Sequence, residues 1–476
     1  MPLLPDLPNE LLGQIMRYLL PDDVDSFSNS CQHFHTLSVE MFPRHKELKK
    51  EYSQVFCGVY GSHKAFNNLS LFRKILKDSE IVWYVKTMFI GLGDFHCIRK
   101  DKETWDDCHD LAVECKDGII KTVHSCPYLD DGERERWING VLSSDQNTTV
   151  TLLASMLPCL EYICFTDNYA NEELNDELHV LVRNIDQARR LDPGGLHALS
   201  KLECVQERGQ AADDLQYMPS FEPLSRLPSM RRYIGRYLYH EDGWTPPEKK
   251  STITSLELID CMIHIAALRS ALSGIENLRD FTYESYWAWE EESMKYRVTE
   301  RTRDWQPGEI ILNLLEFAGH SLVNLGLTRN SRREDQRREE ARGCMKRSLE
   351  GKEEKRDYRI NGVFKWFMGS LRGFEVLEKI RVQNEMLVEE APDDKIGQRV
   401  VHRLVDLLPV SISEVSLAKP LLDKEDWYRL MEGLQELRVE RVPRLERVIC
   451  EGLNHKGYMD TVFEADGLEF IPSEAD

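Results

Sequence analysis

A spacing of apolar residues that recurs nine times constrains the fold of this chain more than any other feature. Each occurrence has an apolar residue, two intervening residues, a second apolar residue, one intervening residue and a third apolar residue, an alternation that indicates a strand. The occurrences are Val85/Met88/Ile90, Leu160/Ile163/Phe165, Ile253/Leu256/Leu258, Leu278/Phe281/Tyr283, Leu322/Leu325/Leu327, Leu377/Ile380/Val382, Ile412/Val415/Leu417, Leu434/Leu437/Val439 and Leu445/Val448/Cys450. Helical stretches lie between them, at 263–272, 309–317, 363–371 and 400–408. Strands that alternate with helices predict an α/β fold with parallel strands.

Three further segments extend this prediction. Leu202/Val205 and Met230/Tyr233 are weaker matches to the same spacing. Residues 81–90 are rich in β-branched and aromatic residues and end before Gly91, a composition that predicts a buried strand.

The recurring spacing resembles the LxxLxL strand core of leucine-rich repeats. The resemblance implies an irregular solenoid of parallel strands and helices over residues 81–476. It departs from the family in two ways, because no repeat has Asn at the usual turn position and the spacing varies from about 22 to 55 residues, against 20–29 in a regular repeat. An unrelated α/β arrangement is the alternative.

The strand pattern also predicts a binding face. The three apolar side chains of each strand should face the core, and the residues between them should face the opposite side. The predicted outward residues are Tyr162, Cys164, Ser255, Glu257, Asp280, Thr282, Asn324, Gly326, Lys379, Arg381, Glu414, Ser416, Glu436 and Arg438. Lys379 and Arg381 are a candidate contact for an acidic partner segment, and Glu257 and Asp280 mark the acidic part of the row. The alternative is that Lys379 and Arg381 only pair with Glu378 or Glu436, because surface pairs contribute about 0–1 kcal/mol.

Residues 4–38 predict three short helices. The first runs from about Pro8 to Leu20, and its apolar residues cover more than half of its circumference, which is wider than the stripe that one core needs. Pro21 ends this helix, and Asp22 and Asp23 are predicted to cap the second. About 40 residues cannot bury so much apolar surface alone. The second face therefore packs on the rest of this chain or binds another protein.

This segment resembles the F-box. The resemblance is carried by Leu7 to Leu12, Ile15, Tyr18-Leu19, Asp22 to Val24 and Cys31 to Phe34, under a tenth of the chain. It departs from the family at Gln32 and His33, where basic residues are usual. The resemblance implies that the segment binds the Skp-type adaptor of cullin–RING (SCF) ubiquitin ligases while the remainder of the chain selects substrates. The adaptor-binding candidates are Leu7, Pro8, Leu11, Leu12, Ile15, Leu19 and Val24.

The predicted organisation is thus an F-box at 4–45, a helical bridge at 46–80 and a substrate-recognition domain at 81–476. Two segments interrupt the repeats. Residues 329–359 have a net charge of +4, typical of a solvated insertion, with a basic docking strip as the alternative. Residues 284–308 are rich in Trp and Glu, and they either form a recognition patch or cover the edge of the sheet.

The net charge and the cysteine content limit which partners and which cellular compartment are expected for this protein. A net charge of −21 argues against nucleic acids and anionic membranes as partners. No apolar run approaches the roughly 18 residues of a transmembrane helix, and no secretory signal is recognisable. The N-x-S/T matches at Asn68 and Asn147 are therefore expected to be coincidental. The 12 cysteines are expected to be reduced thiols in the cytoplasm or nucleus.

Motifs for catalysis are missing from the sequence, which predicts neither an enzyme nor a cofactor. One cluster has zinc-ligand residue types, namely His96, Cys97, Cys108, His109, Cys115, His124 and Cys126. It contains no C-x-x-C pair, so scattered thiols are the favoured interpretation. The predicted function is a substrate-recognition subunit of an SCF-type E3 ubiquitin ligase, which binds the adaptor, the cullin scaffold and a protein substrate. The alternatives are a scaffold without ubiquitin transfer and an enzyme with an unrecognised site.

Overall fold

The structure is a computed structural model in which two compact units can be distinguished. The first unit comprises residues 1–210 and 219–230, and the second comprises 211–218 and 231–476. The residues described are 4, 7–58, 68–91, 110–143, 145–166, 172–195, 197–209, 216–217, 220–240, 250–285, 306–329, 367–390, 399–418, 424–451 and 469–473. The boundary between the units falls inside the predicted 81–476 domain and does not coincide with the predicted boundaries at 45 and 80.

The first unit begins with helices whose apolar residues form a small core. These helices are α1 (Asn9–Tyr18), α2 (Val24–Asn29), α3 (Gln32–Ser38) and α4 (Phe42–Tyr52). Leu12, Met16, Val24 and Phe34 are buried, and the Phe27 ring stacks on Phe34 with centroids 4.3 Å apart. One face of α1 is therefore used inside this chain.

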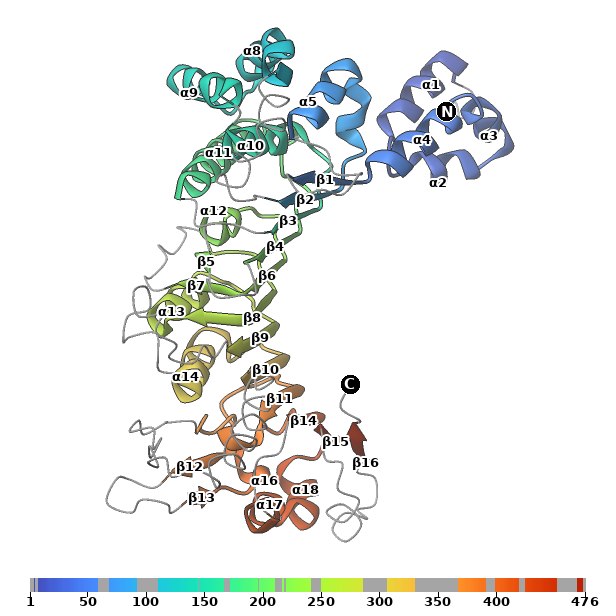
Figure 1. The fold of residues 1–476 in the computed structure, drawn as a ribbon. Coiled ribbons are helices and arrows are strands. Elements are labelled where there is room, and N and C mark those ends of the chain that lie inside the picture. Colours follow the sequence, from blue (N-terminus) through green and yellow to red (C-terminus); the bar gives the residue numbers. More distant parts are fainter. Residues whose placement is uncertain are drawn as a thin grey trace, which may run out of the picture. The chain divides into compact units, whose positions relative to one another are not determined.

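The sheet of the first unit has four parallel strands in chain order, with helices on one face (Figure 1). The strands are β1 (Gln54–Gly58), β2 (Thr87–Gly91), β3 (Tyr162–Thr166) and β4 (Cys204–Arg208). Helices with described bounds in the rest of this unit are α5 (Asn68–Lys77), the 3-10 helix η2 (Ser79–Trp83), α8 (Lys116–Ser125), α9 (Asp131–Leu142), α10 (Gln146–Met156), α11 (Glu172–Leu191) and α12 (Phe221–Leu224). Val55, Met88, Ile163 and Val205 lie opposite one another in the register and are all buried.

The second unit repeats this arrangement with a longer row of parallel strands. They are β6 (Arg232–Arg236), β8 (Ser255–Ile263), β9 (Asp280–Ser285), β10 (Asn324–Arg329), β11 (Lys379–Gln383), β14 (Glu414–Ala418), β15 (Arg447–Glu451) and β16 (Glu469–Ser473). Its described helices are α13 (Ile265–Ser273), α14 (Pro307–Ala318), the 3-10 helix η5 (Asn384–Leu387), α16 (Leu404–Leu407), α17 (Lys424–Met431) and α18 (Leu434–Arg441). Smaller pairings join β5 (Gln216–Tyr217) with β7 (Leu238–His240), β7 with β8, and β12 (Val388–Glu390) with β13 (Arg399–Val401).

The predicted α/β class with parallel strands is confirmed, and all but one of the nine predicted patterns lie in or directly before a strand. The exception is 434–439, which forms α18. Residues 79–83 form η2 instead of the start of a strand, because the Asp78 carboxylate accepts a hydrogen bond from the Glu80 amide. The helix predicted at 363–371 is absent from the described part, 367–371, and that at 400–408 is reduced to α16. Strand β1 lies in the segment that was predicted to be a helical bridge.

Candidate functional site

The apolar residues of α1 divide between a buried side and an exposed side. Leu12 and Met16 have 0% and 1% of their surface exposed, whereas Leu11 has 44% exposed. Of the other adaptor-binding candidates, Pro8 is exposed, and Leu7, Ile15 and Leu19 are half-buried. Leu4 adds a further exposed apolar side chain before the helix. An apolar stripe therefore remains on α1 after the core of the chain has formed.

Two of the predicted adaptor-binding residues belong to that core instead. Leu12 and Val24 are completely buried and have no surface to offer a partner. The sequence could not separate them from Leu11 and Ile15, because the apolar residues cover more than half of the first helix. We name the remaining candidates, Leu7, Pro8, Leu11, Ile15 and Leu19, the α1 stripe.

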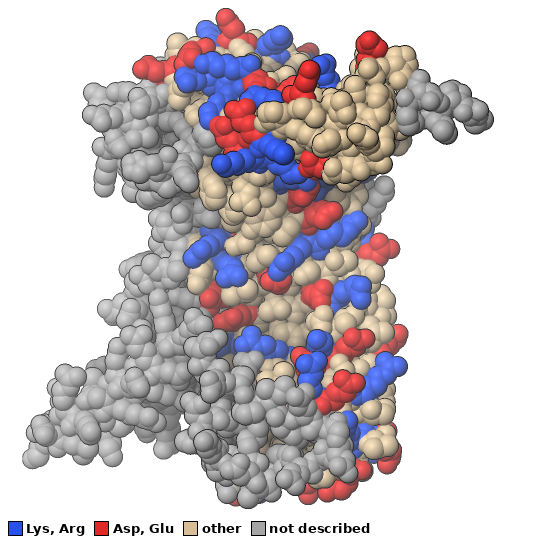
Figure 2. Space-filling model, turned by 90° about the vertical axis from the view of Figure 1, so that its right-hand side faces the viewer, with Lys and Arg blue, Asp and Glu red and all other residues tan. Residues whose placement is uncertain are grey.

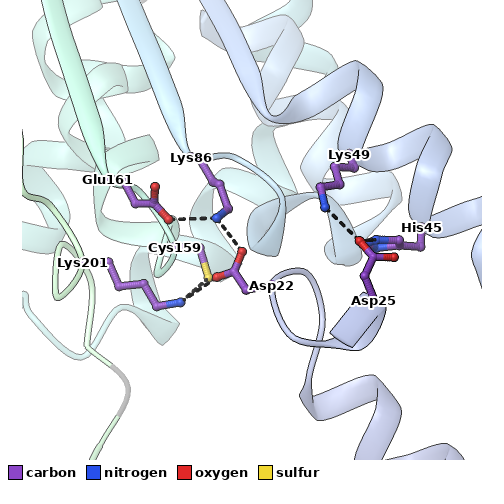
Figure 3. A network of polar contacts seen from close by, with 8 residues as sticks. All are labelled: Asp22, Asp25, His45, Lys49, Lys86, Cys159, Glu161 and Lys201. Atoms are coloured by element: carbon purple, nitrogen blue, oxygen red, sulfur yellow. Dashed lines mark hydrogen bonds and ion pairs between the residues drawn. The ribbon is translucent and has the colours of Figure 1, made fainter. Parts of the chain in front are cut away.

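A network of ion pairs joins the N-terminal helices to the loops before the strands of the first unit (Figure 3). The Asp22 carboxylate lies 2.5 Å from the Lys86 Nζ and 3.1 Å from the Lys201 Nζ. Lys86 also pairs with Glu161 at 2.9 Å, and the Lys201 Nζ lies 3.7 Å from the Cys159 Sγ. Asp22 was predicted to cap α2, but the N-cap residue is Asp23, which makes no side-chain cap hydrogen bond.

The charge of Asp22 is favoured by this setting. Partial burial alone would raise the pKa of its carboxyl, but hydrogen bonds and attraction from Lys86 and Lys201 outweigh burial and lower the pKa below 3.8. The carboxylate is thus ionised at neutral pH and links α2 to segments before β2 and β4.

A second set of contacts lies beside the first. Asp25 of α2 is 3.1 Å from the Lys49 Nζ and 3.5 Å from the His45 Nε2, both on α4. The His45 Nδ1 lies 3.1 Å from the Tyr84 hydroxyl, and burial raises the pKa of Tyr84 to about 12. The two sets together tie α2 and α4 to the chain before β2.

Aromatic residues form a ladder across the strands of the first unit. The Phe56 and Phe89 rings stack with centroids 4.6 Å apart, and Tyr162 follows at 5.8 Å. The Tyr162 hydroxyl donates to the Gln206 Oε1 at 2.7 Å. Tyr162 was predicted to face outward, whereas Phe56 and Phe89 were missed. The signal for Phe56 was the spacing Tyr52/Val55/Cys57, which matches the recurring pattern and surrounds it.

We name the face of the second unit's sheet that the described helices leave open the uncovered face (Figure 1). Its strands align the predicted outward residues in two rows. One row is Ser255, Asp280, Asn324, Lys379 and Glu414, and the other is Glu257, Thr282, Gly326, Arg381 and Ser416. The register aligns these residues as predicted, but Ser416 is buried. Partner binding by these residues stays a prediction. The prediction that Glu436 and Arg438 belong to these rows is wrong, because both residues lie on α18. Arg447 and Ile449 of β15 lie at the corresponding register positions, opposite Glu414 and Ser416. Figure 2 shows acidic and basic side chains interspersed over this side.

The ion pairs on this face differ in how close the two charged groups lie. Arg232 donates through two nitrogens to one Glu257 oxygen, at 2.9 and 2.6 Å. Arg447 lies 2.9 Å from Glu414, whereas Lys379 is 3.9 Å from the same carboxylate. Lys379 therefore has a loose contact with Glu414 in place of the expected pair with Glu378 or Glu436.

Several predictions fall wholly or mainly outside the described residues. They concern 330–359 of the charged insertion, 286–305 of the Trp-rich segment, and His96, Cys97, Cys108 and His109 of the zinc-like cluster. Within the described parts of the chain, no group of three or more His, Cys, Asp or Glu residues could hold a metal ion. No helix among them has the length and apolarity to cross a membrane. Asn68 and Asn147 are each 2% exposed.

The sequence matches no protein-family model, and no curated protein matches it. The surfaces described above therefore carry the functional argument alone.

Proposed function

We propose that this protein is a substrate-recognition subunit of an SCF-type ubiquitin ligase. In this proposal residues 4–45 are an F-box that binds a Skp-type adaptor through the α1 stripe. The parallel strands that follow form a leucine-rich-repeat-like domain whose uncovered face binds a protein substrate. The observation that carries the proposal is the division of α1, with Leu12 and Met16 buried and Leu11 44% exposed.

The physical reason for a partner is the cost of exposed apolar surface. Burial of a side chain such as Leu gives about 1.5–3 kcal/mol, and an apolar stripe on a short helix favours association with another apolar surface. The network around Asp22 supports the proposal because it fixes the N-terminal helices to the sheet of the same unit. A bound adaptor would therefore be held at a defined position relative to that sheet.

The proposed mechanism is proximity. The protein holds a substrate near a ligase that performs the transfer, and it forms no covalent intermediate of its own. Such positioning can supply large gains in rate, because it converts an encounter in solution into a step within one complex.

The test of the proposal is a double substitution on the α1 stripe. Leu11→Asp combined with Ile15→Asp should abolish capture of a purified Skp-type adaptor by the full chain, because both charges would enter the apolar contact. Val439→Asp is the matched control, since Val439 is 83% exposed on α18. Circular dichroism should report the same fold for both variants. Normal adaptor capture by the folded double variant would refute the assignment.

A scaffold that assembles proteins without ubiquitin transfer would use the same surfaces. The two functions differ in the next partner, because only the ligase subunit recruits a cullin through the adaptor. Addition of purified cullin to the adaptor complex therefore separates them.

A further inference from the structure

We propose that the uncovered face of the second unit binds an extended segment of another protein with a basic and an acidic side chain three residues apart. The inference deepens the proposed substrate-binding role and rests on it. Its site is the dipolar row, defined as Asp280 on β9, Asn324 on β10 and Lys379 on β11.

The register fixes the separation of the two charges. Asn324 lies opposite Asp280 on one side and opposite Lys379 on the other. Neighbouring strands are about 4.8 Å apart, so the backbones that carry the two charges are separated by about 10 Å. Asp280 and Lys379 thus present opposite charges on one face at a separation set by the sheet.

The neighbouring charges leave this row available. Glu257 is held by Arg232. The Glu414 carboxylate lies 2.9 Å from Arg447 and 3.9 Å from Lys379. Asp280 accepts a hydrogen bond from the neutral Asn324 amide, which leaves its charge in place. Among the residues that the structure describes, Asp280 has no ion-pair partner. The Lys379 side chain is 49% exposed.

The surface beside the dipolar row, two residues further along β9 and β10, is low and polar. Gly326 is half-buried and has no side chain, and a Cβ there would come within 3.1 Å of the Thr282 Oγ1. Gly326 and Thr282 are direct neighbours in the register. The backbone of a bound segment can therefore approach the sheet beside Asn324, whose amide can hydrogen-bond to it.

The spacing selects the conformation of the partner. A polyproline II segment rises about 3.1 Å per residue and repeats its side-chain direction every three residues. Two side chains three positions apart then share a face and are about 9 Å apart, which matches the dipolar row. A β-strand places such side chains on opposite faces. The partner is thus a proline-rich segment with Lys or Arg three residues from Asp or Glu.

Fluorescence anisotropy of synthetic peptides with the purified full chain tests this inference. The probes are proline-rich dodecapeptides that carry Lys and Glu three residues apart, two residues apart, or with either charge replaced by Ala. The three-residue spacing should bind best, and each Ala peptide should bind about two- to fivefold more weakly, as expected for a surface ion pair. Equal binding of all peptides, or no binding, would overturn the proposal.

Charge reversal distinguishes recognition from damage to the fold. Asp280→Lys should weaken binding of the Lys/Glu peptide and strengthen binding of a Glu/Glu peptide. Lys379→Glu should also weaken binding of the Lys/Glu peptide, and it should strengthen binding of a Lys/Lys peptide. Glu440→Lys on α18, with its side chain 74% exposed, is the control and should change neither preference. If Asp280→Lys weakens every peptide equally, the dipolar row is not the site.

Adaptor capture by the same preparations separates this inference from the proposed function. The Asp280→Lys and Lys379→Glu chains should capture the adaptor normally. Adaptor capture without peptide discrimination would refute the dipolar row alone. Peptide discrimination without adaptor capture would refute the ligase assignment and leave the peptide site standing.

Discussion

Two adjacent aspartates show how far a residue's role depends on distant partners. Asp22 and Asp23 were both predicted to cap α2, but Asp22 instead pairs with Lys86 and Lys201. Lys201 is 179 residues away in the chain, so no local pattern could reveal the contact. The sequence correctly located the helix start, because Pro21 ends the preceding helix, but it could not assign the carboxylate.

The ion pairs of Asp22 predict a pH-dependent contribution to stability. Asp22→Asn should lower the free energy of unfolding by about 1–2 kcal/mol at about pH 6, because it removes charged hydrogen bonds. The pKa of Asp22 is lowered in the folded chain, so its contribution is complete above the unfolded pKa near 3.8 and is lost as the pH falls through the lower folded value. Urea unfolding at about pH 6 and about pH 3 should show the difference shrink on acidification.

Asp23→Asn provides the control for this measurement, because Asp23 is exposed and makes no side-chain cap hydrogen bond. It should leave stability nearly unchanged at both pH values. Equal losses for the two substitutions would mean that the Asp22 network does not stabilise the unit.

At the scale of elements, the recurring pattern identified most strands but could not distinguish every strand from a helix. Residues 434–439 have the same spacing as β15, yet every residue of the segment LQELRVER except Val439 favours helices. The segment also follows Gly433, whose φ is 72°. Strand β1 was missed because its buried Val55 and Cys57 follow directly after α4. The strand faces were predictable because side chains alternate, whereas helix lengths between strands were not.

A substitution on α18 and one on β15 should differ in their effect on the free energy of unfolding. Val439→Glu on α18 should change the free energy of unfolding by less than about 0.5 kcal/mol, because the side chain is 83% exposed. Val448→Ala on β15 should cost about 2 kcal/mol, since Val448 is completely buried. Urea denaturation of both variants measures the two values. A large loss for Val439→Glu would contradict the assignment of 434–441 as a helix.

For the molecule as a whole, each unit carries one part of the proposed task. The first holds the α1 stripe and the Asp22 network, and the second holds the dipolar row. The sequence predicted the parallel-strand class and the outward rows of the second unit from β8 to β14, but it misplaced Glu436 and Arg438, which lie on α18. It could not predict the division into two units, because the strand spacing continues through the residues where that division falls. It also left open which side of α1 is buried.

Complex formation from purified components tests the ligase proposal most directly. The full chain, a Skp-type adaptor and the cullin scaffold are mixed and analysed by size-exclusion chromatography with light scattering. We expect one complex that contains all three proteins and that is lost when Leu11→Asp and Ile15→Asp are combined. Separate elution of the wild-type chain from adaptor and cullin would contradict the ligase proposal.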